Sequence, residues 1–475
     1  MVSWFQAAQY LPTVENPDKE QTLKQMLTWT GITLLLYFLL SEIPIYAADA
    51  QQVETAIQQL RTFQTLLGSE IGTIITLGIG PIVTASIVLQ MMVGSELLKW
   101  DTSTTQGKQK FQAAQKMLAY SLTVVQAAGF TLSGTFGNVA GDPVLMTVIT
   151  GQITLGGWLI ILMDDLVQKW GFGSGVGLFI AGGVSKGIMT QLFSPFAAGQ
   201  AETGSPGSGF FWETGAAPQG QVWEFLLSQS VEAGLVLVST VAVFSAVVYL
   251  QGMKVEIPLT FGNVRGFGQK WPLKFFYTSV MPVIFVAALI ANIQIVGTIA
   301  ADDVTNCSPL GCFDEQGQAT SGLVYLINPP ADFVENLLVG GVTGDLAVTS
   351  FDVFHVLFYI IIYTVGAAMF SIFWAKTTGQ DSDAVADQIQ DTGMKVPGFR
   401  KDKRVIKKVL DRYIPPLVVV AGASVGLIAA AADIFRAAGG GMGILLTVMI
   451  LYRLYEQLAQ KHMEELHPAM KDFFQ

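Results

Sequence analysis

Apolar residues gather along this chain in ten long stretches that are separated by polar connections. Each stretch is long enough to cross, as a helix, the roughly 30 Å of hydrocarbon in a bilayer. The pattern therefore predicts an all-α polytopic membrane protein with ten transmembrane helices. The predicted spans are residues 27–48, 71–94, 112–136, 143–166, 174–197, 223–250, 275–300, 353–376, 414–435 and 441–458.

The second span is preceded by a segment of different character. Residues 50–68 read AQQVETAIQQLRTFQTLLG, an amphipathic stretch that is too polar to cross a membrane, whereas residues 71–94 are predominantly apolar. A short half-helix that leads directly into a spanning helix implies irregular backbone at membrane depth. Such backbone is tolerated only where protein buries it or where it lines a water-filled cavity. We therefore expect a transport pathway at this point of the chain.

The composition agrees with a membrane protein. Of 475 residues, 51% are hydrophobic and 13% are charged, whereas about 25% of the residues in an ordinary globular domain are charged. Residues 1–25 carry Glu15, Asp18 and Glu20 and lack the basic head of a cleavable signal peptide. Aromatic residues near the start, such as Trp4, indicate a short interfacial helix instead.

Lysine and arginine residues are concentrated in alternate connections and predict the orientation. The connections after even-numbered spans are basic, and the one after span eight holds eight basic residues from Lys395 to Arg412. The other connections hold only Arg61 and Arg436. Because basic connections stay on the cytoplasmic side, we expect a multi-pass protein of the cell membrane with both termini in the cytoplasm.

The spans divide into two sets of five. Residues 199–220, rich in Gly, Ser and Pro, separate the sets, so the expected halves are residues 1–220 and 221–475. An odd number of spans in each half places the second half in inverted orientation. Inverted halves recur in membrane transporters, whose substrate site lies at the repeat interface. An ion-coupled secondary transporter of a small solute is therefore one functional interpretation.

No set of residues typical of an enzyme is visible in the sequence. The three histidines, His355, His462 and His467, do not pair with Cys, Asp or Glu at metal-binding spacing. The glycine run at 439–443 opens a membrane span without a preceding strand, unlike a phosphate-binding loop. We expect no catalytic residue, metal or cofactor. Lys186 lies inside the fifth span, where an ionisable group marks a candidate functional position: it could line an outer funnel, reach outward or bind a coupled ion.

The two cysteines, Cys307 and Cys312, lie in the external connection after span seven, within NCSPLGC. Disulfides persist in the oxidising environment outside the cell, so we expect a structural disulfide that closes a small loop. A redox-active pair would need a different spacing and a different fold.

Five stretches that cover the whole chain resemble the SecY family, and most closely its archaeal branch. They are LGIGPIVTASIVLQ at 77–90, GFGSGVGLFIAGGVS at 171–185, VEIPL at 255–259, RYIPPL at 412–417 and AAGGGMGILLTVMILYRLYEQL at 437–458. The resemblance implies a clamshell of two inverted five-helix halves, hinged at residues 199–220. It also implies a protein-conducting channel that translocates secretory polypeptides across the cytoplasmic membrane and releases transmembrane segments sideways into lipid. Signal sequences and partners would gate this channel.

By this resemblance, six aliphatic residues are expected to form a ring that constricts the pore. A dry aliphatic neck blocks ions because an ion would have to shed its water to enter. Two pairs within the ring are four residues apart, which places the members of each pair on one helix face. Ordinary packing is the alternative interpretation of any single member. The matching positions are Ile79, Val83, Val176, Ile180, Ile284 and Leu446.

The amphipathic half-helix, residues 53–66, is similar to the plug of the family, which folds back beneath the ring from outside. The alternative is a surface helix on the outer leaflet. Direct continuity of residues 53–66 with the glycine-broken second span favours the plug.

In the family, spans two and seven form the seam of a lateral gate. Three polar residues match gate positions: Thr84, Gln126 and Asn292. In an apolar bundle such residues also hold helices together by hydrogen bonds worth about 0.6–1.7 kcal/mol each. The two roles are compatible, because the same bonds would set how hydrophobic a signal must be to open the seam.

Two of the expected cytoplasmic connections, residues 252–274 and 379–412, are unusually basic. The resemblance implies that they dock a ribosome, since Lys and Arg side chains contact the phosphates of nucleic acids. The alternative is contact with anionic lipid, worth about 1 kcal/mol for each basic residue near the surface. Further implied partners are SecE-like and beta-type small membrane subunits in a heterotrimer, signal peptides, nascent chains and membrane lipids. The expected docking residues are Arg265, Arg400, Lys401 and Lys403.

Overall fold

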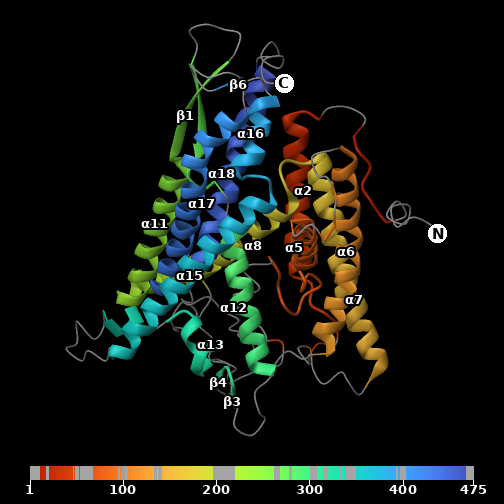
Figure 1. Ribbon diagram of the computed structural model, residues 1–475. Helices are drawn as coiled ribbons and strands as arrows, with labels where there is room; N and C mark the ends of the chain where they lie inside the picture. Colours follow the sequence, from red (N-terminus) through yellow and green to blue (C-terminus); the bar gives the residue numbers. More distant parts are fainter. Residues whose placement is uncertain are drawn as a thin grey trace. The chain divides into compact units, whose positions relative to one another are not determined.

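The structure, a computed structural model, describes most of the chain (Figure 1). The expected N-terminal interfacial helix lies outside the described residues, and so does the expected plug apart from Val53. The described residues are 11–17, 21–46, 48, 53, 68–94, 97–98, 100, 105–132, 136, 142–195, 220–261, 268–277, 281–299, 307–313, 319–330, 333–334, 336–337, 349–391, 394–395 and 403–466.

Each of the ten apolar stretches contains a helix, which confirms the predicted polytopic helical fold. Seven helices of the described part are long and apolar enough to cross a membrane. The principal helices are α2 (Leu23–Ser41), α5 (Gly80–Gly94), α6 (Thr105–Leu132), α7 (Pro143–Trp170), α8 (Gly175–Phe193), α10 (Gln221–Ser228), α11 (Val231–Gly252), α12 (Met281–Ile299), α13 (Gly322–Ile327), α15 (Ser350–Thr377), α16 (Ser382–Asp391), α17 (Lys403–Ile434) and α18 (Gly440–Leu466).

The second span begins as a helix later than the sequence pattern predicts. Regular helix starts at Gly80, whereas residues 68–79, which we call the entry segment, form a series of turns. Gly72 and Gly78 adopt φ values of 90° and 50°, which residues with a side chain rarely reach. These two glycines therefore interrupt the helix that apolar residues alone would have formed from residue 71.

The chain divides into two compact units. Unit 1 comprises Met1–Val184 and Ile450–Gln475, and unit 2 comprises Ser185–Met449. The last part of α18 therefore packs with the beginning of the chain: a Cβ atom added at Gly177 would lie 3.5 Å from Ile450, and one added at Gly173 would lie 2.6 Å from Leu454. The expected division at residue 220 stays a prediction.

In unit 1, helices α2 and α6 both pack on α7, and α6 and α7 lie side by side (Figure 1). Helix α7 begins at an Asp–Pro pair that is typical of helix starts: Asp142 accepts hydrogen bonds from the backbone N–H groups of Val144 and Leu145, and Pro143 occupies the first turn. The apolar side chains Ile149 and Ile153 are fully buried on this helix.

The N-terminal strap, residues 11–17, is tied to the other end of α7. The Asp165 carboxylate accepts hydrogen bonds from the Val14 backbone N–H (2.9 Å) and from Lys116 Nζ (2.7 Å). Lys169 Nζ lies 3.0 Å from the same carboxylate and also donates to the Val14 carbonyl. The Trp170 indole N–H donates to the Glu15 carbonyl at 2.8 Å. Buried Asp165 is thus compensated by two cations and a peptide group, as a buried charge must be.

In unit 2, helices α15 and α17 pack along each other (Figure 1). Gly422 and Gly426 of α17 permit this approach, because a Cβ atom at Gly426 would lie 2.5 Å from the Tyr363 carbonyl oxygen of α15. The Ser371 hydroxyl crosses the same interface and donates to the Val418 carbonyl at 2.7 Å. Small residues with hydroxyl hydrogen bonds are the usual means of joining helices in lipid.

The connection that follows α11 contains a sheet that the sequence analysis did not predict. Strands β1 (Lys254–Phe261) and β2 (Gly268–Lys274) pair antiparallel, and β6 (Met394–Lys395) adds to the other edge of β1. Leu273 of β2 joins an apolar core with Ile389 of α16 and Ile406 of α17. The two basic connections therefore have one folded base, in which α16, α17 and β2 share a core.

Candidate constriction and its supporting contacts

The entry segment is held at its beginning by backbone pairing with the residues that follow α2. The Ile45 N–H donates to the Gly72 carbonyl at 2.9 Å, and the Ile74 N–H donates to the Ile43 carbonyl at 3.0 Å. Val53, the one described residue of the expected plug, would lie 2.5 Å from a Cβ atom at Gly72. These pairs join both ends of the connection that carries the expected plug.

Inside unit 1 the entry segment packs on α2, α7 and α8. The Tyr37 hydroxyl of α2 donates to the Gly68 carbonyl at 2.7 Å. Gly156 of α7 touches the backbone of Ile74, since a Cβ atom at position 156 would lie 1.9 Å from the Ile74 oxygen. The Thr76 hydroxyl donates to the Thr73 carbonyl at 2.6 Å and accepts from the Gly72 N–H at 3.2 Å. Protein groups thus satisfy irregular backbone, as membrane depth requires.

Four of the expected ring residues belong to unit 1. Ile79 and Val83 lie where the entry segment becomes α5, and the Val83 N–H donates to the Ile79 carbonyl at 3.0 Å. Ile79 is fully buried and Val83 is half-buried. Val176 and Ile180 lie in the first two turns of α8, the first half-buried and the second buried. Both pairs have the helical spacing that the sequence predicts.

The first turn of α8 is held by a carboxylate that the sequence analysis missed. Asp164 of α7 accepts a hydrogen bond from the Val176 N–H at 2.9 Å and another from the Gln168 amide at 2.8 Å. A side chain at Gly175 would lie 2.7 Å from the same carboxylate, so only glycine fits there. The sequence feature that could have indicated this contact is the acidic pair Asp164–Asp165 at the end of an apolar span. Lys186, further along α8, is half-buried.

The other two expected ring residues, Ile284 and Leu446, belong to unit 2. Ile284 is half-buried on α12, and Leu446 is buried on α18. The beginning of α18 is fixed by Asp433, which accepts from the Gly441 N–H at 2.6 Å and from the Tyr359 hydroxyl at 2.9 Å. Closure of all six residues into one ring stays a prediction.

Polar contacts join α5 to α6, the helices that carry the expected gate residues Thr84 and Gln126. The Gln126 amide lies 3.5 Å from the Thr84 hydroxyl, at the outer limit of a hydrogen bond. The Gln115 amide is much closer to the Ser86 hydroxyl, at 2.5 Å. This shorter contact between α5 and α6 was not predicted from the sequence. Asn292 lies in α12, but its side chain is outside the described residues.

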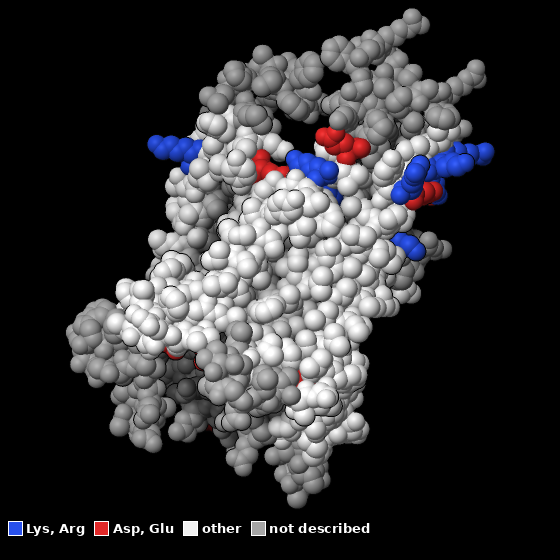
Figure 2. All heavy atoms as spheres, turned by 90° about the vertical axis from the view of Figure 1, so that its left-hand side faces the viewer, with Lys and Arg blue, Asp and Glu red and all other residues white. Residues whose placement is uncertain are grey.

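Three of the expected docking residues, Arg265, Arg400 and Lys401, lie outside the described residues. Lys403 is the first residue of α17. Close to it on α17, Lys407 forms an ion pair of 2.7 Å with Asp383 of α16. Figure 2 shows Lys and Arg side chains toward one end of the face it draws, beside a broad uncharged band.

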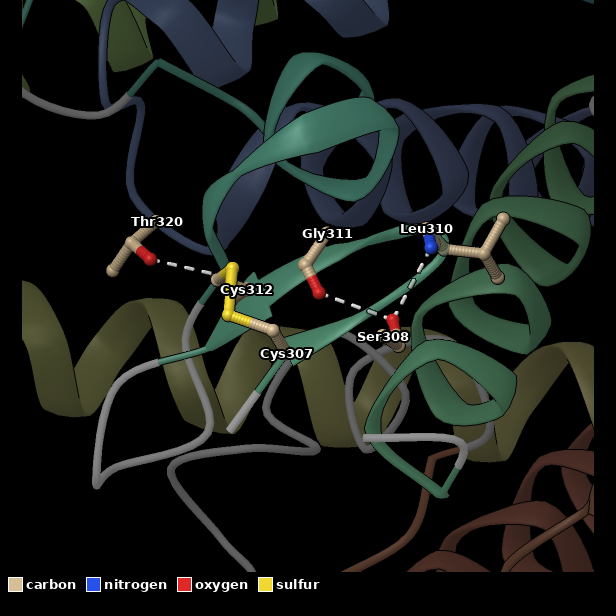
Figure 3. Close-up of a disulfide and its surroundings, with 6 residues drawn as sticks. All are labelled: Cys307, Ser308, Leu310, Gly311, Cys312 and Thr320. Atoms are coloured by element: carbon tan, nitrogen blue, oxygen red, sulfur yellow. Dashed lines mark hydrogen bonds between the residues drawn. A yellow bond between two sulfur atoms is a disulfide. The ribbon is translucent and has the colours of Figure 1, made fainter. Parts of the chain in front are cut away.

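Cys307 and Cys312 are joined by a disulfide in unit 2 (Figure 3). They face each other across the short antiparallel strands β3 (Cys307–Ser308) and β4 (Gly311–Phe313), and β5 (Ala319–Ser321) pairs with β4. Phe313, next to Cys312, packs on the end of α12, because its ring would lie 3.0 Å from a Cβ atom at Gly297. The disulfide therefore closes a hairpin that rests on α12.

Comparison with known proteins connects these features to one family. The family pattern described as SecY matches residues 73–455. A protein translocase subunit SecY from Methanothermobacter thermautotrophicus is 39% identical over 472 residues, which cover 98% of this chain and 96% of that protein.

Two solved structures are similar over nearly the whole chain. One is described as showing that the plug domain of the SecY protein stabilises the closed state of the translocation channel and maintains a membrane seal; it is 38% identical, with a TM-score of 0.76 and 98% of each chain covered. The other is Sec61 in the canine ribosome–channel complex from the endoplasmic reticulum, 38% identical with a TM-score of 0.74 and the same coverage.

Proposed function

This chain belongs to the SecY family, and from that premise we propose how its residues carry out protein transport. It is a protein-conducting channel of ten transmembrane helices, through which secretory polypeptides cross the membrane and transmembrane segments pass into lipid. The similarity to translocase subunits over 98% of the chain carries this conclusion. A small-solute transporter finds no support among these relatives.

The constriction proposed here is made of Ile79, Val83, Val176, Ile180, Ile284 and Leu446. Aliphatic side chains suit a neck that must pass any polypeptide, because they offer no fixed charge or hydrogen bond to a passing sequence. An apolar neck also excludes ions by dewetting. The hydrogen bond of Asp164 to the Val176 backbone supports this assignment, since it fixes the turn that carries one ring residue.

The plug proposed for this chain is the segment 53–66. A plug domain stabilises the closed state in a similar protein, and here both ends of the corresponding connection are fixed by the Ile45–Gly72 and Tyr37–Gly68 hydrogen bonds. The seam for lateral release would lie at α5 and α12, with Thr84, Gln126 and Asn292 setting its resistance to opening.

The partners proposed for this channel are a translating ribosome and small SecE-like and beta-type membrane subunits. A similar protein is found in a ribosome–channel complex. The folded base formed by β2, α16 and α17 would hold the basic connections with Arg265, Arg400, Lys401 and Lys403 toward rRNA phosphates. This arrangement requires the basic connections and both termini to be cytoplasmic, which the distribution of Lys and Arg favours. The channel itself would catalyse no reaction, and energy would come from a partner.

Photocrosslinking of a stalled secretory nascent chain tests this function. We expect adducts when the crosslinking amino acid replaces Val83 or Ile284, because both half-buried residues would line the path. Position 361 of α15 is the control, since Ile361 is 57% exposed on a face proposed to meet lipid. Equal crosslinking from all three positions, or from none, would contradict the proposed pore.

A further inference from the structure

A buried hydrogen bond joins the expected plug connection to the rest of unit 1. The Tyr37 hydroxyl, the polar end of a side chain only 2% exposed within an apolar span, donates to the Gly68 carbonyl at 2.7 Å. The Tyr37 ring is stacked on Phe179 of α8, with 5.0 Å between ring centroids. The ring is therefore held by packing while the hydroxyl selects one backbone atom.

The accepting residue, Gly68, lies directly on the backbone of α8. A Cβ atom at Gly68 would be 3.1 Å from the Phe179 oxygen and 3.4 Å from the Ile180 nitrogen. Its φ of 51° is also unfavourable for a residue with a side chain. The backbone that follows the expected plug thus contacts the peptide that carries the expected ring residue Ile180.

A second glycine makes room for this contact. A Cβ atom at Gly183, one turn after Phe179 on α8, would be 3.0 Å from the Tyr37 hydroxyl oxygen and 3.5 Å from the Gly68 Cα atom. Any side chain there would press on both partners of the hydrogen bond. Tyr37, Gly68 and Gly183 therefore form one unit, which we call the Tyr37 clamp.

We propose that the Tyr37 clamp fixes the end of the plug connection on α8 and thereby sets how readily the resting channel opens. This inference rests on the proposed function of residues 53–66. Tyr37 is buried within a proposed membrane span, where water cannot replace a lost partner of the Gly68 carbonyl. A single neutral hydrogen bond contributes modestly, so it biases the closed state without locking it against a signal sequence. Tyr37 is on this account a positioning residue that acts through Gly68.

The first test is ion conductance of the resting channel in planar bilayers. Tyr37→Phe removes only the hydroxyl, and loss of one net hydrogen bond is expected to raise the resting open fraction about fivefold. Translocation of precursors with weakened signals should increase in parallel. The matched control is Tyr46→Phe, at a tyrosine 74% exposed. Resting conductance of Tyr37→Phe equal to that of the control would overturn the clamp.

A glycine pair on α8 provides a second, independent variant. Gly183→Ala should also increase resting conductance, because the new methyl group displaces the Tyr37 hydroxyl. Gly187→Ala, one turn further along the same helix, meets no atom within 4 Å and should leave the channel silent. Equal conductance of the two alanine variants would contradict the proposal even if Tyr37→Phe failed to fold.

Combination with deletion of residues 53–66 separates a positioning role from a general loss of stability. If the clamp acts through the plug, Tyr37→Phe will add no conductance to the deletion variant, because coupled changes are not additive. If the conductance increases caused by Tyr37→Phe and by the deletion multiply in the combined variant, the clamp is overturned. A deletion variant that is as silent as the unmodified channel would instead overturn the proposed plug, so the two failures are distinguishable.

Discussion

The entry segment of unit 1 and helix α17 of unit 2 both depend on two glycines, but they use them in opposite ways. In the entry segment, Gly72 and Gly78 have positive φ and interrupt the helix. In α17, Gly422 and Gly426 remain helical and let α15 approach until backbone atoms nearly touch. The path of the entry segment is therefore set largely by hydrogen bonds with other parts of unit 1, such as those of Tyr37 and Ile45. Helices α15 and α17, in contrast, form a rigid pair.

This difference teaches where the molecule can change without unfolding. The α15–α17 pair is stabilised by contacts along most of two long helices, so opening it means losing them all. The entry segment is held by separate local bonds, such as those of Tyr37 and Thr76. Regions that move in function are drawn from such weakly cooperative parts of a structure. Substitutions in the two regions should therefore produce different kinds of defect.

The largest effect is expected at the contact of α7 with the entry segment. Gly156→Ala would place a methyl group 1.9 Å from the Ile74 oxygen, and backbone must move to accept it. We expect a loss of roughly 3 kcal/mol in the free energy of unfolding, together with resting ion leakage. Gly151→Ala on the same helix meets no atom within 4 Å and should gain about 0.5–1 kcal/mol from helix propensity. Chemical denaturation in detergent measures both, and equal shifts would refute the contact.

A smaller effect, and a different one, is expected in the rigid pair. Gly426→Ala places a methyl group 2.5 Å from the Tyr363 oxygen and should cost about 2 kcal/mol without ion leakage. Gly366→Ala on α15 meets only the side chain of Val286, whose nearest atom is a methyl group at 3.0 Å, and a rotamer change can relieve this contact, so its cost should be lower. Thermal unfolding of the two variants measures which of them is less stable. Leakage in Gly426→Ala at permissive temperature would mean that the two regions do not differ as described.

The smallest global effect is expected at the disulfide. Cys307→Ser with Cys312→Ser should destabilise the hairpin β3–β4 by about 2 kcal/mol at most, because a short loop recovers little chain entropy. Hydrogen exchange should increase near Gly311 and Phe313 while the midpoint of global unfolding hardly moves. Thiol labelling of the unmodified, non-reduced protein in native membranes is the direct measurement. Two reactive thiols would show that Cys307 and Cys312 are not joined by a disulfide there.

Much of the fold could be predicted because apolar length is a local property. Ten stretches suitable for spanning the bilayer each contain a helix, and the spacing of Ile79 and Val83 is reproduced as a helical hydrogen bond. The hairpin β1–β2 was missed although Val255, Ile257 and Leu259 alternate with polar neighbours or proline. Prolines at 258 and 272 are unfavourable within a strand, which weakens the signal of this alternation.

The contacts that support the site could not be predicted in the same way. The Tyr37 hydroxyl donates to a backbone carbonyl, and the Asp164 carboxylate accepts from a backbone N–H. Because nearly every residue has these backbone groups, the sequence does not show which one a side chain will contact. A sequence pattern shows a lone hydroxyl in an apolar span but not which carbonyl it reaches 31 residues later. The polar contact of Gln115 with Ser86 was missed for a related reason, since both residues are ordinary in a helix.

The membership of residues 450–475 in unit 1 has a consequence for the synthesis of this protein. Gly173 and Gly177 are made early, but their neighbours Leu454 and Ile450 appear only after all of unit 2 has been translated. At a typical rate of translation this delay is on the order of tens of seconds. The first unit to be synthesised is thus the last to be completed. If translation stops before residue 450, Gly177 of α8 and the preceding Gly173 lack their contacts with Ile450 and Leu454.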